Sequence, residues 1–367
     1  MPNASPILKN PAPDFDTLVR VLGGEEKARK VHQVELVIDA EILQAIQEKY
    51  LGRKWIPCTG ETEEEYIKQR IDIHRLLGYD FVLEGAWRTV WQNHPPLKSP
   101  STTDTAGELA RDRREWANEG LGIITSWETF ENFPWDDIGI DYSPYEIMAR
   151  NLPDGMKIAV SSCVFEHVLE NLLGYEGLFY LIHDEPELVA EVFSRWGQKV
   201  YDYYKTVVEM DAVGAIFHAD DLGFKTSIML QPDYLRQRVF PWFKKFAELA
   251  HDHGKPYWYH CCGNLYDGGV IEDIIKDVGI HGLHSFEKTI IAPADFKSRY
   301  GTHVGMMGGV DMDNLCRMNE KDLRSYIRDL LETCMPDRFA LGSGNTVANY
   351  VPVDNYIAML DEGRKFA

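Results

Sequence analysis

The chain has 367 residues, of which 44% are hydrophobic and 26% charged, so it can bury a large core and is neither disordered nor fibrous. Its 58 acidic residues outnumber its 38 Lys and Arg, and the resulting formal charge of -20 disfavours nucleic acid or an anionic membrane as a partner. The six cysteines are thinly spread, and the first residues lack the pattern of a signal peptide. We therefore expect a cytoplasmic protein, without a membrane span.

The predicted elements begin with an irregular, proline-rich stretch. Residues 1–60 predict an N-terminal extension with short helical patches. A capping box at Thr62 precedes an apolar series at helical spacing, and Gly78 provides the stop signal. Beyond it, short apolar runs alternate with long helical periods, and no shift in composition marks a linker.

Eight such apolar runs are present in the chain, each predicting a strand. They cover residues 79–83, 121–126, 157–162, 213–217, 256–260, 279–283, 303–307 and 338–341. Eight strand–helix alternations predict an α/β fold, a single closed (β/α)8 TIM barrel over residues 61–367 that follows the extension of residues 1–60. A doubly wound open sheet is the structural alternative.

In such a barrel the chemistry belongs at the carboxyl ends of the strands, and polar and aromatic side chains do follow the predicted strands. Those that we single out are Glu84, Trp87, Trp127, Glu131, His167, His218, Asp220, Asp221, His260, Cys262, Glu287 and Asn345. The loop of residues 94–104 belongs to the same face and is a candidate lid.

The sharpest local cluster is His260-Cys261-Cys262. An imidazole and a thiolate at positions i and i+2 of a strand point to the same face and can share one zinc ion. A third soft ligand is missing, because the turn at residues 342–345 reads Gly-Ser-Gly-Asn. The alternative is a hydrogen-bonded histidine beside two buried, apolar cysteines.

A second candidate metal site combines Glu131, Glu146 and His167, which are separated by fourteen and twenty residues. Two carboxylates and an imidazole would leave zinc more Lewis-acidic than thiolates do, which suits an ether or alcohol oxygen. The alternative is a pair of solvated glutamates with His167 capping a helix.

Asp220 and Asp221 lie beside His218 after the fourth run. Paired carboxylates can share a proton and act as a general acid, although one of them could equally cap the following helix. Trp87 and Trp127 belong to an aromatic group that could stack on a flat ring or simply anchor loops.

Several segments together resemble the uroporphyrinogen decarboxylase superfamily, whose members are (β/α)8 barrels. They are Phe-Glu-His at 165–167, Ala-Asp-Asp-Leu-Gly at 219–223, Tyr-His-Cys-Cys-Gly-Asn at 259–264, Gly-Gly-Val-Asp at 308–311 and Val-Pro-Val-Asp-Asn at 351–355. The Arg-Gln-Ala-Gly-Arg segment with which the decarboxylases grip their substrate has no counterpart here. The resemblance therefore favours the other large branch, the corrinoid-dependent methyltransferases.

Two subtypes of that branch compete. Enzymes that methylate a thiol use His-x-Cys and a later Cys, and this chain matches them at His260 and Cys262 but has Ser343 near the place of the late cysteine. The phenyl methyl ether O-demethylase methyltransferases look more similar, because a Glu-x14-Glu-x20-His zinc pattern of some members is reproduced here.

The resemblance implies an enzyme that moves a methyl group from a methoxylated aromatic to the Co(I) corrinoid of a partner protein. The expected zinc ligands are Glu131, Glu146 and His167. The expected catalytic residues are Asp220, Asp221, His218 and His260, and the expected substrate-binding residues are Trp87, Trp127, Glu84, Cys262, Glu287 and Asn345. A thiol methyltransferase, a decarboxylase and a non-enzymatic binding module are the alternatives, and a homodimer is compatible with the sequence.

Overall fold

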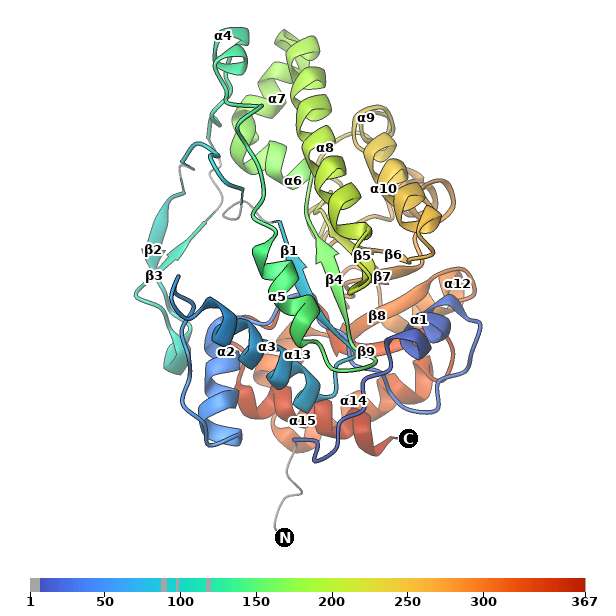
Figure 1. Cartoon of the computed structure of the whole chain (residues 1–367). Helices are drawn as coiled ribbons and strands as arrows, with labels where there is room; N and C mark the ends of the chain where they lie inside the picture. Colours follow the sequence, from blue (N-terminus) through green and yellow to red (C-terminus); the bar gives the residue numbers. More distant parts are fainter. Residues whose placement is uncertain (1–6, 87–90, 97–98, 117–119, 367) are drawn as a thin grey trace.

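The fold is built around a curled parallel sheet, which confirms the predicted α/β barrel class (Figure 1). The structure is a computed structural model that describes residues 7–86, 91–96, 99–116 and 120–366. The sheet has seven strands in the order β1-β4-β5-β6-β7-β8-β9. They are β1 (Phe81–Gly85), β4 (Lys157–Ser161), β5 (Val213–Ala219), β6 (Tyr257–His260), β7 (Gly282–His284), β8 (Gly305–Val310) and β9 (Phe339–Ser343).

Seven of the eight predicted runs overlap these strands, and the prediction of a strand at residues 121–126 is wrong. The backbone N–H groups of residues 122–124 donate to the carbonyls of residues 171–173 at 2.7 to 3.1 Å, so they do not join the sheet. The apolar pattern has another cause, since the side chain of Ile124 is fully buried outside the barrel wall. A short apolar run alone does not distinguish a strand from a buried loop.

The N-terminal segment of residues 32–38 lies where the sheet would otherwise be open. Gln33 forms parallel bridges with Tyr79, just before β1, and with Leu341 of β9. The contact is close, because a Cβ atom on Gly342 would lie 1.9 Å from the carbonyl oxygen of Val34. A segment of the predicted extension thus packs between the first and last strands and takes the eighth position of the barrel wall.

The amino end of the barrel is filled by side chains. Helix α1 (Phe15–Gly23) inserts Phe15, Leu18 and Leu22 into a buried cluster with inward-facing residues of the strands. The ring of Phe15 lies 5.7 Å from that of Trp258, measured between centroids. Only the carboxyl end of the barrel is therefore left for chemistry, as in other barrels of this type.

Helices surround the sheet and cover its outer face (Figure 1). The longer ones are α3 (Glu63–Leu77), α5 (Ser143–Asn151), α7 (Tyr175–Asp184), α8 (Pro186–Val208), α10 (Phe240–Asp252), α12 (Pro293–Tyr300), α14 (Glu320–Cys334) and α15 (Val353–Lys365). The shorter ones are α2 (Ala40–Ala45), α4 (Trp127–Glu131), α6 (Phe165–His167), α9 (Pro232–Arg238), α11 (Val270–Glu272) and α13 (Met312–Arg317), and a hairpin of β2 (Ser101–Thr103) and β3 (Arg113–Glu115) lies beside the barrel. Within the described residues, none of the helices has the length and apolar character needed to cross a membrane.

Helix α3 allows its two predicted end signals, the capping box at Thr62 and the stop at Gly78, to be compared with the structure. It begins at Glu63, and Gly78 ends it in the left-handed conformation, at a φ of 88°. The predicted capping box is not formed, however, because the Thr62 hydroxyl donates to the carbonyl of Pro57 at 2.6 Å instead of accepting from the helix. The stop signal was thus a better guide than the cap.

Candidate metal-binding active site

The segments that leave β5, β6 and β7 are held together at the carboxyl end of the barrel. The backbone N–H of Asp220 donates to the carbonyl of His260 at 3.0 Å, and the N–H of Cys261 donates to the carbonyl of His284 at 2.8 Å. These bonds continue the parallel pairing beyond the strands. They place the first residues after neighbouring strands side by side.

Asp221, His260 and Cys262 form the one cluster of candidate metal ligands found among the described residues. A carboxylate oxygen, an imidazole nitrogen and the thiol sulfur all lie within 4.8 Å of one another. The backbone N–H and the thiol of Cys262 donate to the two carboxylate oxygens of Asp221, each at 2.7 Å. The Nε2 atom of His260 lies 3.8 Å from Oδ1 of Asp221.

Burial sets the protonation of this cluster. It lowers the pKa of His260 to about 3, so the imidazole is neutral near pH 7. Burial is the main cause that raises the pKa of Cys262, and the negative charge of Asp221 adds to it. Burial likewise raises the pKa of Asp221. In the metal-free protein we therefore expect a thiol that donates to Asp221.

The three residues fit a zinc ion. Neutral imidazole nitrogen, thiolate sulfur and carboxylate oxygen are all common zinc ligands, and three protein ligands leave a position for substrate. A cation would reverse the effect of burial on the thiol pKa, because it stabilises the thiolate. Of the residues predicted from sequence, His260, Cys262 and Asp221 are thus brought together, with Asp221 in place of a second cysteine.

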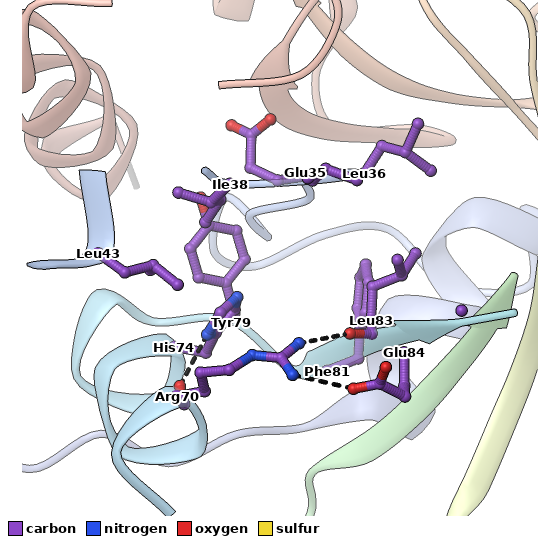
Figure 2. A pocket seen from close by; sticks show the side chains of 12 residues that line it. Glu35, Leu36, Ile38, Leu43, Arg70, His74, Tyr79, Phe81, Leu83 and Glu84 are labelled. Atoms are coloured by element: carbon purple, nitrogen blue, oxygen red, sulfur yellow. Dashed lines mark hydrogen bonds and ion pairs between the residues drawn. The ribbon is translucent and has the colours of Figure 1, made fainter. Parts of the chain in front are cut away.

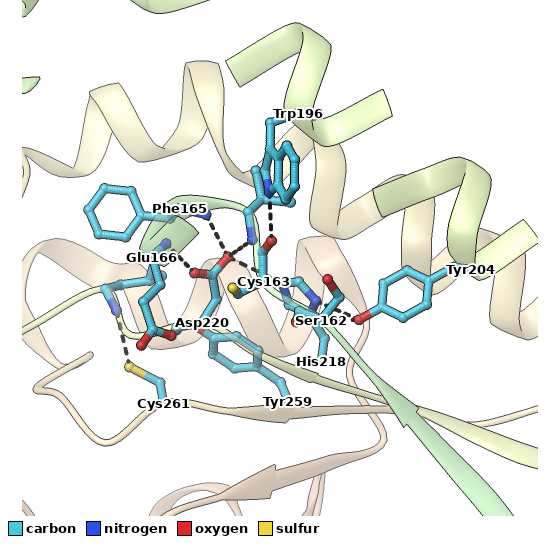
Figure 3. Close-up of polar contacts among 12 residues, drawn as sticks. Ser162, Cys163, Phe165, Glu166, Trp196, Tyr204, His218, Asp220, Tyr259 and Cys261 are labelled. Carbon is cyan, nitrogen blue, oxygen red and sulfur yellow. Dashed lines mark hydrogen bonds and ion pairs between the residues drawn. The ribbon is translucent and has the colours of Figure 1, made fainter. Parts of the chain in front are cut away.

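Asp220 and His218 have surroundings that point to a structural role. Asp220 is fully buried and accepts the backbone N–H groups of residues 164–166, at 2.6 to 2.8 Å, at the start of α6 (Figure 3). The Nε2 atom of His218 lies 3.3 Å from the same carboxylate, and its Nδ1 lies 3.0 Å from the hydroxyl of Tyr204. Asp220 therefore holds the turn after β4 and the start of α6, an earlier helix, and not the following helix that the sequence suggested.

The predicted ligand set of Glu131, Glu146 and His167 is not brought together as a metal-binding group in the described part of the chain. Glu131 ends α4 and Glu146 lies on α5, and both are exposed. His167 is buried, and its Nε2 lies 3.1 Å from Nε2 of His94. Its ring stacks on that of Trp196 at a centroid distance of 3.8 Å. The three residues lie on separate helices, and sequence spacing could not reveal that.

Glu84 lines a cavity of about 170 Å³ between residues 35–38, α3 and β1 (Figure 2). Its carboxylate accepts from the guanidinium of Arg70 at 2.9 Å, and Arg70 also donates to the carbonyl of Leu83 at 3.0 Å. Glu84 therefore ties β1 to α3, and this cavity lies at the seam closed by the N-terminal segment.

The other predicted substrate-binding residues have scattered partners. Glu287 forms an ion pair with Lys225 at 2.8 Å. The side chain of Asn345 accepts the neighbouring backbone N–H at 2.8 Å. Trp127 is 40% exposed on α4, and Trp87 lies outside the described residues. A role of these residues in substrate binding stays a prediction.

Two further residues, one in contact with His260 and one in contact with Ser343, were not among the site residues predicted from the sequence. His284, at the end of β7, places its Nδ1 2.7 Å from Nδ1 of His260. Glu35 is buried in the N-terminal segment and contacts Ser343 of β9. The position of His284 directly after a predicted strand was a usable signal. Glu35 gave none, because its segment was assigned to an irregular extension.

The sequence profile of the uroporphyrinogen decarboxylase (URO-D) family matches residues 167–366, more than half of the chain, so the protein belongs to this family. A search among curated proteins gave no match.

Two solved structures match this chain over most of its length. A methyltransferase from Methanosarcina mazei is 17% identical, with a TM-score of 0.70 over 97% of this chain and 99% of that one. A protein from Listeria monocytogenes, described as a vitamin-B12-independent methionine synthase, is 11% identical, with a TM-score of 0.49 over 92% and 96% of the two chains. The first likeness supports the barrel fold predicted from the sequence.

Proposed function

We propose that the protein is a methyltransferase which moves a methyl group between a small molecule and the corrinoid of a partner protein. The observation that carries this proposal is the cluster of Asp221, His260 and Cys262 at the carboxyl end of the barrel. The methyltransferase of similar fold and the missing Arg-Gln-Ala-Gly-Arg segment support it further. Both favour methyl transfer over decarboxylation of a tetrapyrrole.

Zinc is the metal that we expect at this cluster, held by Asp221, His260 and Cys262. When bound, it would act as a Lewis acid toward the heteroatom that carries or receives the methyl group. The chain itself orients the ligands, because the Cys262 backbone N–H fixes the carboxylate of Asp221 before any ion arrives. Outside the cluster, His284 contacts the imidazole of His260.

An aryl methyl ether is the methyl donor that we propose first. The Co(I) corrinoid supplies the electron pair to the methyl carbon, the carbon–oxygen bond breaks, and a phenolate leaves with that bond's electrons. Negative charge develops on the ether oxygen and must be offset in the site. The oxygen ligand Asp221, in place of a second thiolate, is a harder donor and suits a metal that meets an ether oxygen.

A thiol is the second candidate, and the position of the cluster favours it. His260 and Cys262 have the spacing that the resemblance associates with thiol methylation, whereas the Glu131, Glu146 and His167 set has not come together. In this case a thiolate attacks the methyl group of a methyl-corrinoid, the cobalt–carbon bond breaks, and Co(I) keeps the electron pair.

The experiment tests ether demethylation and thiol methylation separately, each with the zinc-loaded protein. One arm mixes it with Co(I) cobalamin and guaiacol and follows methyl-cobalt absorption; the other mixes it with methylcobalamin and 2-mercaptoethanol and follows Co(I). Turnover in the first arm supports ether demethylation, and turnover in the second supports thiol methylation. Inactivity in both arms, with carbon dioxide released from a porphyrinogen in the absence of cobalt, would overturn methyl transfer.

A further inference from the structure

The imidazole of His260 has a second partner, on the side away from Asp221. Its Nδ1 lies 2.7 Å from Nδ1 of His284, and Nε2 of His284 lies 3.0 Å from the carbonyl oxygen of Ser343. His260 is 5% exposed and His284 is fully buried. Nδ1 of His260 and both nitrogens of His284 thus have their partners within the protein.

These contacts fix which nitrogen carries a proton. A carbonyl oxygen only accepts hydrogen bonds, so Nε2 of His284 is the N–H donor. A neutral imidazole has a single N–H, and Nδ1 of His284 is therefore an acceptor. Since that acceptor lies 2.7 Å from His260, Nδ1 of His260 must donate to it. The lone pair of neutral His260 is then on Nε2, the atom that faces Asp221.

We propose that His284 is a positioning residue, which holds His260 in the tautomer whose Nε2 lone pair is directed to the metal cluster. The proposal rests on the metal site proposed above. Outer partners of metal-ligating histidines act in this way generally, by fixing the tautomer and the ring orientation. Here the outer partner is a second histidine, whose own tautomer is set by a backbone carbonyl.

The surroundings hold His284 in the required place. Ser343 is fixed by Glu35, whose carboxyl group accepts the Ser343 backbone N–H at 3.0 Å and contacts its hydroxyl at 2.5 Å. Gly308 leaves room for the ring, since a Cβ atom there would lie 3.0 Å from Cδ2 of His284. The N-terminal segment, β8 and β9 thus all determine where the Ser343 carbonyl and the His284 ring meet.

The first test measures the tautomer directly in the metal-free protein. Long-range nitrogen–proton correlation spectra of protein labelled with ¹⁵N-histidine distinguish the two nitrogens, and a His260→Gln variant assigns the signals. We expect His260 protonated on Nδ1 and His284 protonated on Nε2. Protonation of His260 on Nε2 would overturn the proposal. Because no metal is added, the result does not depend on the proposed function.

The second test compares two amides of similar chemistry at position 284. An asparagine oxygen can occupy the place of Nδ1 and still accept from His260, whereas glutamine reaches the place of Nε2 and keeps only the bond to Ser343. Zinc affinity is measured by competition with a chromophoric chelator. We expect His284→Gln to weaken binding about 10- to 100-fold and His284→Asn to bind within about threefold of the original.

The outcomes separate the two proposals. Equal losses in both variants, with the His260 tautomer unchanged, would overturn the positioning role. X-ray absorption that places His284 itself in the metal's coordination shell would also overturn it. Wild-type protein that binds no zinc, while His260 keeps the expected tautomer, would instead count against the proposed metal site alone.

Discussion

Asp221 accepts two hydrogen bonds from Cys262, one from the backbone N–H and one from the thiol, each at 2.7 Å. The two residues follow neighbouring strands, β5 and β6, and the bonds join the loops that leave them. A ligand pair that is held before metal arrives loses little conformational freedom on binding. The geometry of this pair is set by the barrel and not by a flexible loop alone.

Cys262→Ser should weaken zinc binding at least about tenfold, because it removes the one sulfur ligand of the cluster. Cys261→Ser is the matched control. The sulfur of Cys261 accepts the backbone N–H of Leu222 at 3.4 Å and is not a member of the cluster. Equal zinc affinity of the two variants would contradict our assignment of the ligand.

Zinc affinity should rise with pH. The pKa of the Cys262 thiol is raised by burial and by Asp221, so the metal-free protein holds a proton that zinc must displace. Isothermal titration in buffers of different ionisation enthalpy should therefore show about one proton released per zinc near pH 7. A Cys262→Ser variant that releases the same number would show that the proton comes from elsewhere.

Asp220→Ala should destabilise the fold by about 3 kcal/mol, because it leaves buried backbone N–H groups at the start of α6 without a hydrogen-bond acceptor. Asp329→Ala, at an exposed position of α14, is the control and should change stability by less than about 0.5 kcal/mol. Urea unfolding measures both. A stable Asp220→Ala variant that has lost methyl transfer would point to a catalytic Asp220 instead.

Glu35 should make the protein less stable as pH rises from about 4.5 to 8. Burial raises the pKa of Glu35 to about 8, so in this range the folded chain keeps a proton that the unfolded chain releases. The full loss is at most about 5 kcal/mol, at 1.36 kcal/mol per pKa unit. Glu35→Gln mimics the protonated form, and its free energy of unfolding should lack this slope. An unchanged slope would show that Glu35 is ionised in the folded state.

Gly342→Ala should push the N-terminal segment out of the barrel wall. The added Cβ atom would lie 1.9 Å from the carbonyl oxygen of Val34, a backbone atom that cannot rotate away. Overpacking of this kind costs about 1–3 kcal/mol or more. Gly139→Ala, which meets no atom within 4 Å, is the control. Hydrogen exchange at residues 32–38 should accelerate in the first variant alone, and equal protection in both would contradict the close contact.

The barrel was predictable because most of its strands correspond to short apolar runs between amphipathic helices in the sequence. The exceptions have physical reasons. Residues 121–126 are apolar because Ile124 is buried in a loop, and the segment around Gln33 forms only isolated bridges, so its pattern is too short to stand out. Closure of the wall depends on contacts between residues about 300 positions apart, such as Val34 and Leu341, which sequence periodicity does not reveal.

The candidate site was predictable in part. The spacing of His260 and Cys262 identified two members of the cluster, and the strand end identified Asp221 without its role. Its neighbour Asp220 has the same chemistry but points to the start of α6, a difference that only the backbone direction decides. The position of His284 after a predicted strand was visible in the sequence, but its role was not, because that role depends on contact with a nitrogen of His260 on the adjacent strand.

The location of the metal tests the account most directly. Crystals of the zinc-loaded protein, measured on both sides of the zinc absorption edge, give the ion's position without assumptions about its ligands. We predict one strong anomalous peak bounded by Asp221, His260 and Cys262. A peak among Glu131, Glu146 and His167, with the first cluster empty, would contradict the account.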